Sequence, residues 1–446
     1  MEAPEQRVDA DAARKERAAR HIVSVLRRAG HVAYFAGGCV RDRLLGRDPG
    51  DYDVATDAPA AQVQRLFPRT VPVGVQFGVI LVLADGIPIE VATFRTDAEY
   101  ADGRHPVSVR FSTPEEDAQR RDFTINGMFF DPETEEVIDY VGGAADLRAG
   151  VIRAIGDPRA RLHEDRLRML RAVRFAARFG YEIEPATLGA VRALAPEITT
   201  IAWERIGDEI VKILTEGAAR RGFELLDTTG LLAHVLPEVA AMKGVEQSPD
   251  YHPEGDVFRH TLLPLEQLDG ASETLALGAL LHDVAKPRCA GRKGERITFY
   301  GHCELGEQMA IATCQQLRRS RVVWERVGFL VREHLRLTSA PDMRLSTLRR
   351  FLAQDGIDEL LELGRMDALA SNKDLRFYEF CRAKRDELGR EQIKPPPLLR
   401  GADLIEAGFT PGPLFSKILD AVEERQLEGE LHSRDEALVW VKGRDW

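Results

Sequence analysis

A change of hydrophobic pattern near residue 160 limits the possible folds more than any other feature of this 446-residue chain. Between residues 21 and 140, helical and extended segments alternate, whereas from about residue 160 the helical pattern continues almost to the end. We expect helices at HIVSVLRRAG (21–30) and VRDRLLG (40–46), and strands at HVAYFAGG (31–38), DYDVAT (51–56), GVILVLADGIPIEVATFR (78–95) and RDFTINGMFFDP (121–132). Asp85-Gly86 is the expected hairpin turn. The pattern predicts an α+β protein, with a mixed sheet followed by helical domains.

Two segments rich in turn-forming residues divide the helical part, EQSPDYHPEGD (246–256) and IKPPPLL (393–399). We therefore expect a lead-in helix, a sheet-containing head, a helical neck and body, a second helical domain and a helical tail, at 1–20, 21–155, 156–245, 250–392 and 393–446. HEDRLRMLRAVRFAARFG (163–180) is the clearest expected helix, because it has few β-branched residues and ends in glycine.

Composition excludes several classes of protein. The sequence has no run of about 18 apolar residues, and its N-terminus lacks the apolar core of a secretory signal. Its five cysteines form no CxxC pair, which is typical of a reducing cytosol. We therefore expect a cytoplasmic protein without a membrane partner.

Charge is distributed unevenly along the chain. The formal net charge of −11 argues against a general nucleic-acid binder. However, eight arginines lie between Arg153 and Arg178, opposed only by Asp157, Glu164 and Asp165. Such a basic stripe is either a contact for phosphate groups or a solvated helix face, and charge alone does not separate the two.

Asp51 and Asp53 are the strongest candidates for catalytic residues. On a strand, side chains two positions apart point to the same face, so the two carboxylates converge. They repel each other unless a cation lies between them, and Mg²⁺ prefers such oxygen ligands together with substrate phosphates. Two-metal sites of this kind stabilise the attacking and leaving oxygens of a displacement at phosphorus. Taken alone, an Asp-x-Asp pair is more often a solvated turn.

Flanking residues favour the catalytic interpretation. Gly37 and Gly38 lie between an expected strand and helix, where the absence of side chains lets backbone N–H groups approach a polyphosphate. Arg41 follows one helical turn later and can reach the same phosphates. Glu90 alternates with apolar neighbours on a later strand and could add a third carboxylate.

These residues belong to a longer motif. GGCVRDRLLGRDPGDYDVAT (37–56) resembles the signature of the class II, or bacterial-type, tRNA nucleotidyltransferase and poly(A) polymerase superfamily. The resemblance extends through GRHP (103–106), RRDFTIN (120–126), HEDRLRMLRAVRFAARFGY (163–181) and ERIGDEIVKIL (204–214). It implies a polymerase-β-like nucleotidyltransferase head with a helical neck and body behind it. It also implies Mg²⁺ held by Asp51 and Asp53, with Glu90 as the third carboxylate.

Glu164, Asp165 and Arg168 are expected to select the base. On one helix, Asp165 and Arg168 would be neighbours, with Asp165 accepting hydrogen bonds and Arg168 donating them. Cytosine and adenine match this pair because both present an amino donor beside a ring-nitrogen acceptor, whereas uracil and guanine do not. The alternative is an ordinary helix salt bridge. EDxxR at this place resembles the family's nucleotide-selecting motif.

Further nucleotide-binding candidates follow from the resemblance. Arg121, Asp122 and Asn126 lie on a strand pattern that is close to the selecting helix in the family. Arg121 would contact the triphosphate, and Asp122 and Asn126 would bind the sugar or brace the site, unless all three are structural polar residues. Arg171 and Arg174 follow Arg168 on the same expected helix and are counted with the nucleotide-binding residues.

Residues 93–119 are polar and predict a long loop. In the family, a flexible loop at this place helps to change the pocket from C to A specificity, and enzymes that add only CC lack it. Its presence therefore argues against a CC-only enzyme, but it does not separate CCA addition from A-only addition.

A second set of candidate ligands follows residue 250. His260, His282, Asp283, His302, His334 and Asp367 occur in an order that resembles the HD phosphohydrolase superfamily. Histidine and carboxylate together suit Mn, Fe, Ni or Zn, although any single histidine is more often a satisfied core residue. The resemblance implies activity on 2′,3′-cyclic or terminal phosphates, or a domain that serves mainly as an RNA-binding scaffold. The tail after residue 398 also resembles the C-termini of HD-bearing members of the family.

The expected function is template-independent addition of CMP and AMP to the tRNA 3′ end, from CTP and ATP, with the acceptor stem as a further contact. The same motifs occur in enzymes that add only A and in poly(A) polymerases, so the sequence leaves both activities open. It also leaves open an HD phosphohydrolase with a degenerate transferase half, or a non-catalytic RNA-binding protein. The intact GGCVRD, DYD and EDRLR segments disfavour these last two.

Overall fold

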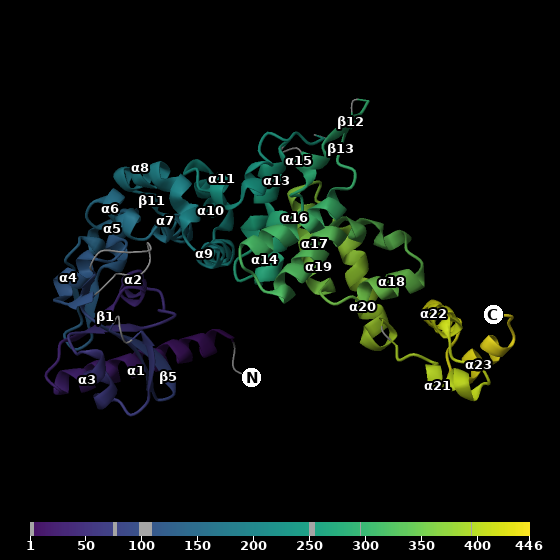
Figure 1. Cartoon of the computed structure of the whole chain (residues 1–446), viewed down its shortest axis with the longest axis horizontal. Coiled ribbons are helices and arrows are strands. Elements are labelled where there is room, and N and C mark those ends of the chain that lie inside the picture. The colour runs from purple at the N-terminus through teal and green to yellow at the C-terminus, as the bar shows by residue number, and fades with distance from the viewer. Residues whose placement is uncertain (1–3, 75–77, 98–108, 249–254, 295, 394) are drawn as a thin grey trace. The chain divides into compact units, whose positions relative to one another are not determined.

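The computed structural model describes residues 4–74, 78–97, 109–248, 255–294, 296–393 and 395–446. The chain forms two compact units, Met1–Pro237 and Glu238–Trp446, and each is described by itself. Figure 1 shows a sheet with helices in the first unit and mainly helices in the second. Among the described residues, no helix is both long and apolar enough to cross a membrane.

A mixed seven-stranded sheet lies at the centre of the first unit, in the order β3-β4-β5-β2-β1-β8-β9. Strands β2 and β5 run parallel, and the other neighbouring pairs are antiparallel. The strands are β1 Ala33–Ala36, β2 Asp53–Thr56, β3 Thr70–Gly74, β4 Val79–Ala84, β5 Ile87–Thr93, β8 Phe129–Asp131 and β9 Glu136–Ile138. The sheet and the helical remainder confirm the α+β class expected from the sequence.

Residue type explains the hairpin between β4 and β5. Asp85 and Gly86 have φ angles of 51° and 78°, the left-handed conformation of a two-residue type I′ turn. Along both strands, buried apolar residues alternate with less buried ones, so one face of the sheet is apolar. Helix α1 (Pro4–Arg28) covers that face in one continuous core. The opposite face has only a small core around Phe94 and Phe129.

Shorter elements complete the first unit. They are α2 Gly38–Leu44, α3 Ala60–Leu66, β6 Arg95–Asp97, β7 Val109–Phe111, α4 Pro114–Gln119, η2 Thr124–Asn126, α5 Gly143–Ala149, β10 Val151–Ile152, α6 Pro158–Glu164, α7 Leu167–Phe179, β11 Glu182–Ile183, α8 Pro185–Leu194, η3 Ala195–Thr200, α9 Trp203–Thr215, α10 Ala219–Thr228 and α11 Leu232–Val235.

The predicted single helix over 163–180 is wrong, because two helices meet there. Asp165 lies between α6 and α7 with extended φ and ψ angles of −148° and 107°. Its Oδ1 accepts a hydrogen bond from the backbone N–H of Leu167 (3.0 Å). A short polar side chain that bonds to nearby backbone in this way offers the chain an alternative to continuing the helix.

Two further predictions change in detail. The RDFTIN segment is not a strand, because Asp122 Oδ1 accepts from Phe123 N (2.7 Å) and Thr124–Asn126 form a 3₁₀ turn. The predicted loop over 93–119 is partly regular, since β6 pairs with β7 and α4 follows. Its middle, residues 98–108 with the GRHP motif, lies outside the described residues, as do 249–254 of the first predicted break.

The second unit is mainly helical, as expected. Its elements are α12 Pro237–Ala240, α13 Val257–Leu262, η4 Pro264–Gln267, α14 Glu273–Leu281, α15 Lys286–Cys289, β12 Gly291–Lys293, β13 Arg296–Thr298, α16 His302–Gln316, α17 Arg321–Glu333, η5 His334–Asp342, α18 Leu345–Leu352, α19 Ile357–Ala370, α20 Arg376–Ile393, α21 Gly401–Glu406, α22 Pro413–Glu428 and α23 Arg434–Lys442. The last three helices share a small core of their own.

Candidate functional site

Three carboxylates gather on the open face of the sheet in the first unit. Asp53 begins β2, and Glu90 of β5 is its register partner in the parallel pair. Both side chains are exposed and alternate with buried residues, so they share one face. Asp51 precedes the strand rather than lying on it. Tyr52 between the two aspartates is buried against Phe35, with ring centroids 5.2 Å apart. Asp51 and Asp53 therefore both face away from the core, as expected.

The charges of Asp51, Asp53 and Glu90 favour the binding of a cation. Desolvation raises the pKa of Asp53 to about 6, with further increases from the neighbouring carboxylates of Glu90 and Asp51 and a partial offset from Arg121. Lys15 of α1 donates to Gly50 O (2.5 Å), and its ammonium lies 3.5 Å from Asp51 Oδ1. An all-oxygen set of carboxylates at the surface fits Mg²⁺, whose binding would relieve the repulsion.

The glycine pair lies beside this group. Gly37 precedes α2 with a φ angle of 73°, a left-handed conformation that glycine adopts without strain. A Cβ at this position would lie 3.1 Å from Arg121 Nη1, so a side chain would press on that arginine. Arg41 of α2 is buried, and it donates to Asn126 Oδ1 (2.7 Å) and to Asp42 Oδ1 (2.9 and 2.8 Å). Its guanidinium therefore braces the site instead of facing solvent.

Asp122 connects the site to α7. Its Oδ1 accepts from Asn126 Nδ2 (3.2 Å), and its Oδ2 accepts from Arg171 Nε (2.8 Å). Although burial opposes it, the charges of Arg171 and Arg168 lower the pKa of Asp122 to about 2. Asp122 and Asn126 are thus fully engaged by protein groups, which supports the bracing role considered from the sequence.

Asp117 is a residue of this site that the sequence did not reveal. Its side chain is buried, and its Oδ2 accepts from Arg121 Nε and Nη2 (3.2 and 3.0 Å), while Oδ1 accepts from Arg120 Nε (2.9 Å). Arg121 also donates to Asn126 O (3.4 Å). These bonds hold Arg121 beside Gly37 and Asp53, where the predicted triphosphate would lie.

The expected pair of Asp165 and Arg168 is not formed in the described structure. Arg168 Nη1 donates to Glu164 Oε2 (2.6 Å) and Arg161 O (2.8 Å). Asp165 instead binds both terminal nitrogens of Arg205 on α9 (3.1 and 2.7 Å). The break between α6 and α7 is the physical reason, because it removes the helical spacing on which the prediction depended. Arg205 lies in the quoted ERIGDEIVKIL motif but was given no role.

The basic stripe is largely neutralised within the protein. Arg174 is buried and pairs with Glu209 (2.7 Å) and Glu216 (2.9 Å), so its contacts give no support to the predicted nucleotide binding. Further ion pairs join Arg153 to Asp146, Arg161 and Arg168 to Glu164, Arg166 to Glu197, Arg171 to Asp122 and Arg178 to Glu216.

In the second unit, the side chains predicted as metal ligands converge on Asp283. Its Oδ2 lies 3.3 Å from His282 Nε2 and 3.8 Å from His260 Nε2. Its Oδ1 lies 3.6 Å from His302 Nε2 and 3.9 Å from His334 Nε2. Each of the five side chains is buried.

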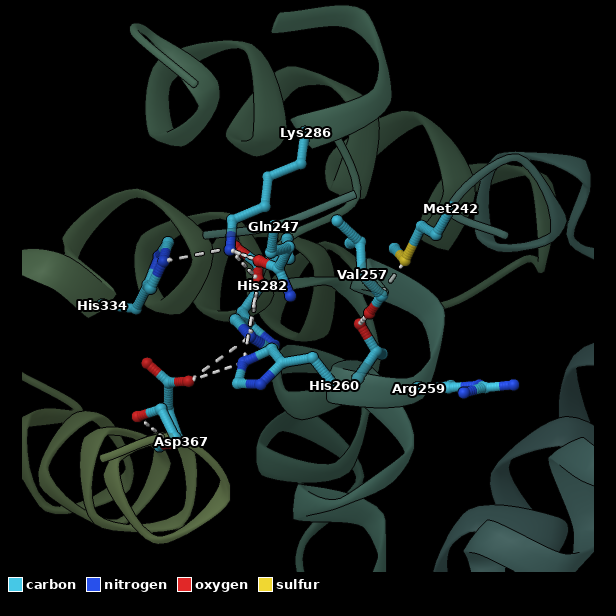
Figure 2. A network of polar contacts seen from close by, with 12 residues as sticks. Met242, Gln247, Val257, Arg259, His260, His282, Lys286, His334 and Asp367 are labelled. Carbon is cyan, nitrogen blue, oxygen red and sulfur yellow. Dashed lines mark hydrogen bonds and ion pairs between the residues drawn. The ribbon is translucent and has the colours of Figure 1, made fainter. Parts of the chain in front are cut away.

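Asp367 completes this cluster from α19 (Figure 2), with its Oδ1 2.9 Å from His260 Nε2 and 3.8 Å from His282 Nε2. The structure therefore brings together all six predicted side chains, although they come from distant parts of the sequence.

Three histidine rings of the cluster have the orientation that metal-binding histidines adopt. Nδ1 of His282, His302 and His334 each bonds to the backbone carbonyl three residues earlier, at 2.7–2.9 Å, which turns Nε2 toward Asp283. The buried Asp283 Oδ2 lies 3.3 Å from His282 Nε2 and 2.7 Å from the Lys286 ammonium. A cation held between the buried imidazoles and carboxylates would complete their bonding. The donor set of imidazoles and carboxylates fits a transition metal.

A cavity of about 670 Å³ opens onto the cluster, lined by Asp283, Lys286, His334, Asp367 and Arg376 among others. Lys286, which the sequence prediction missed although it follows His-Asp closely, lies 2.7 Å from Asp283 Oδ2 and donates to Gln247 Oε1 (2.6 Å). The cavity thus combines acidic ligands with two cationic groups.

Comparison with known proteins gives consistent matches. Residues 33–153 match the family described as "Poly A polymerase head domain", and residues 180–243 match "Probable RNA and SrmB- binding site of polymerase A". The chain is 44% identical over 431 residues to the CCA-adding enzyme of Limosilactobacillus fermentum, covering 95% of this chain and 96% of that protein. It is 34% identical over 423 residues to the CCA-adding enzyme of Levilactobacillus brevis, covering 94% and 96%.

A solved structure agrees with these matches. The crystal structure of the Bacillus stearothermophilus CCA-adding enzyme in complex with CTP superposes with a TM-score of 0.73 at 28% identity. The similarity covers 96% of this chain and 97% of that one.

Proposed function

Because this chain belongs to the class II family of CCA-adding enzymes, we propose that it adds CMP and AMP to the 3′ end of tRNA from CTP and ATP. The terminal 3′-hydroxyl attacks the α-phosphate, and pyrophosphate leaves. The observation that carries this proposal is the juxtaposition of Asp51, Asp53 and Glu90 on the open face of the sheet, in a chain that aligns over 95% of its length with a CCA-adding enzyme.

Each residue of the site has a proposed role. Asp51, Asp53 and Glu90 would hold Mg²⁺, which lowers the barrier by neutralising charge on the attacking and leaving oxygens when bound. Gly37 and Gly38 leave room for the phosphates beside Arg121, whose position Asp117 fixes.

Arg41, Asp122, Asn126 and Arg171 form a connected set that we propose holds the nucleotide pocket in shape. Arg174 would act only through α7, since its own contacts are with Glu209 and Glu216.

We retain the proposal that Asp165 and Arg168 read the base. Its physical support is that an acceptor and a donor follow each other closely at the start of α7, each held by a separate protein partner. These partners prevent the two side chains from pairing with each other, so an acceptor and a donor stay in place for a base. Glu164 and Arg205 then serve as the residues that orient them.

One experiment tests the reaction. The full chain is given tRNA that lacks CCA, with each single NTP and with CTP plus ATP, and the products are sequenced. We expect CCA from CTP plus ATP. Addition of A only to tRNA that already ends in CC would show an A-adding enzyme. Unlimited A tails on both tRNA and unstructured RNA would show a poly(A) polymerase.

A second candidate function concerns the second unit. We propose that His260, His282, Asp283, His302, His334 and Asp367 bind transition metal and act as an HD-type phosphohydrolase on terminal or 2′,3′-cyclic phosphates of RNA. Its support is the convergence of the six side chains beside a cavity that Asp283, His334 and Asp367 line together with Lys286 and Arg376, two groups able to bind phosphate.

A metal and hydrolysis assay tests this second activity. Metal content is measured after loading with Mn²⁺ or Ni²⁺, and hydrolysis of a nucleoside 2′,3′-cyclic phosphate is followed, with Asp367→Ala as the inactive variant. Metal binding without hydrolysis would leave the unit as an RNA-binding scaffold. If the protein neither binds metal nor hydrolyses the cyclic phosphate, the proposed metal site is rejected. The domain limits and the cytoplasmic location remain predictions from the sequence.

A further inference from the structure

A short hairpin in the second unit carries a group of cationic side chains. Strands β12 (Gly291–Lys293) and β13 (Arg296–Thr298) pair antiparallel, and Figure 1 shows the hairpin projecting from the helices of that unit. The cationic residues of segment 288–296 are all exposed, namely Arg288, Arg292, Lys293 and Arg296. The acidic residue of this segment, Glu295, lies outside the described residues. The segment is therefore basic, although the whole chain has a formal net charge of −11.

Two of these cations lie directly opposite each other. Lys293 and Arg296 are register partners, so their side chains leave the same face of the two strands. Like charges in this arrangement destabilise a strand pair. Within the described residues, no ion pair joins either side chain to a carboxylate. An anion bound between the two cations would remove their repulsion, so the hairpin is suited to binding a polyanion.

The remaining arginine of the two strands has an easily displaced partner. Arg292 Nη2 lies 3.4 Å from Glu246 Oε2, and the two side chains are 68% and 74% exposed. An ion pair at this exposure contributes little to stability, because solvent screens the two charges. A phosphate group could therefore take the place of Glu246 without a large loss of stability.

An exposed aromatic ring follows the hairpin directly. Tyr300 is 76% exposed, although a tyrosine ring is usually at least half-buried. Cations together with an exposed aromatic ring are typical of surfaces that bind RNA, since phosphates contact the cations and unpaired bases stack on the ring. The preceding residue, Phe299, fixes the base of the hairpin. Its ring lies 5.3 Å from the Lys286 ammonium, and its carbonyl accepts from His302 Nδ1 (2.7 Å).

We propose that this hairpin is an RNA-binding surface, in which Arg292, Lys293 and Arg296 contact backbone phosphates of tRNA and Tyr300 stacks on an unpaired base. A nucleic acid matches both features because it presents closely spaced phosphates together with bases, whereas an acidic protein surface has no bases. The inference goes beyond the addition of CMP and AMP, and it rests on the proposed function because that function makes tRNA the substrate.

The salt dependence of binding tests the phosphate contacts. The full chain is titrated against labelled tRNA lacking CCA, without nucleotides, and Kd is measured by fluorescence anisotropy at several salt concentrations. Lys293→Gln with Arg296→Gln should weaken binding by roughly 10–100-fold at low salt. The slope of log Kd against log salt should fall by about 1.4–1.8, because two phosphate contacts are lost. Without RNA, the melting temperature of this variant should not fall, because the repulsion between the two cations is removed.

Variants of Tyr300 separate stacking from charge. Tyr300→Ala should weaken binding by roughly 5–100-fold with an unchanged salt slope, because one base loses its stacking partner. Tyr300→Phe keeps the ring and should bind tRNA as the parent protein does. Arg321→Gln with Arg332→Gln is the matched control for charge, since it removes two exposed cations of helix α17. This control should also bind tRNA as the parent protein does.

The possible results distinguish the hairpin from the reaction. If the variant of Lys293 and Arg296 has the affinity and salt slope of the control, the RNA-binding surface is overturned. Unchanged affinity in Tyr300→Ala would overturn the stacking contact. CMP addition is measured on the same samples. A parent protein that binds tRNA through the hairpin but adds no CMP would contradict the proposed function and leave the hairpin in place.

Discussion

At the scale of single residues, the paired carboxylates show a conflict between stability and function. Asp53 and Glu90 are held opposite each other on adjacent strands, where like charges repel. The raised pKa of Asp53, to about 6, means that the folded state binds its proton more tightly than the unfolded chain does. The stability that this carboxyl contributes is therefore greatest at low pH and is lost as the pH rises through about 6.

Replacement of Asp53 should separate the two effects. Asp53→Asn is expected to reduce CMP addition by roughly 10³-fold or more, because several kcal/mol of charge stabilisation in the transition state are lost. At pH 7.5 without added metal, its melting temperature should not fall, because the repulsion from Glu90 is removed. Incorporation of labelled CMP into tRNA lacking CCA measures the activity, and thermal unfolding measures the melting temperature.

The control for this variant is Asp48→Asn, since Asp48 is exposed in the same loop before β2. Both its activity and its melting temperature should match the parent protein. Normal CMP addition by Asp53→Asn would remove this residue from the proposed site.

Arg168 should govern the choice of base. Arg168→Ala is expected to lower the preference for CTP and ATP over UTP and GTP by roughly 10–100-fold, because a partly buried donor that penalises the wrong bases is lost. The ratio of kcat/KM values for the four nucleotides is the measurement. Arg159→Ala, an exposed arginine of the neighbouring helix, is the matched control. Unchanged selectivity in Arg168→Ala would leave the residue as a structural link to Glu164.

At the scale of elements, local sequence predicted the strands better than the turns of the site. The hairpin at Asp85-Gly86 was predictable because its conformation depends on two adjacent residues. The break at Asp165 was missed because only part of its cause is local: the carboxylate accepts from Leu167 N, and Arg205, forty residues later, also binds it. Asp117 was missed for a different reason: Arg120 and Arg121 lie three and four residues after it, but the burial that makes these ion pairs important follows only from packing.

In the second unit, the six residues that the sequence predicts as metal ligands do come together, as their resemblance to the HD superfamily implied. Lys286 lies only three residues after Asp283, so this contact could have been inferred from spacing, whereas its bond to Gln247 follows only from packing.

Close packing of α5 on η2 makes a test of one element possible. A Cβ at Gly143 would lie 2.2 Å from Thr124 O, in the turn that carries Asn126. Gly143→Ala should therefore destabilise the protein by about 1–3 kcal/mol and raise KM for CTP. The measurements are denaturant unfolding and steady-state kinetics.

Gly189→Ala is the matched control, since no atom lies within 4 Å of a Cβ at this position in helix α8. It should be neutral or stabilise by up to about 1 kcal/mol. If Gly143→Ala and Gly189→Ala changed the free energy of unfolding equally, the packing argument would be contradicted.

At the scale of the whole molecule, the two proposed centres lie in separate compact units. Hard carboxylate oxygens form one centre, and imidazoles with carboxylates form the other. The expected activities therefore depend on different metals and different residues.

Reciprocal variants test this independence. Asp283→Asn should abolish transition-metal binding in the second unit while CMP addition stays within about twofold of the parent. Asp53→Asn should abolish CMP addition while transition-metal binding in the second unit stays unchanged. Metal analysis after gel filtration and the incorporation assay provide both readouts. Loss of CMP addition in a folded Asp283→Asn protein would show that the centres are coupled.

The internal pairing of the arginines on α6 and α7 has a consequence for how RNA binds. A phosphate that reaches Arg166 or Arg178 must displace Glu197 or Glu216, so one anion replaces another and fewer counterions leave the nucleic acid. Affinity for tRNA should consequently fall less steeply with salt than a count of basic residues implies. The freed glutamates would then repel RNA strands bound in other positions. Binding would therefore depend on the shape of the RNA as well as on its charge.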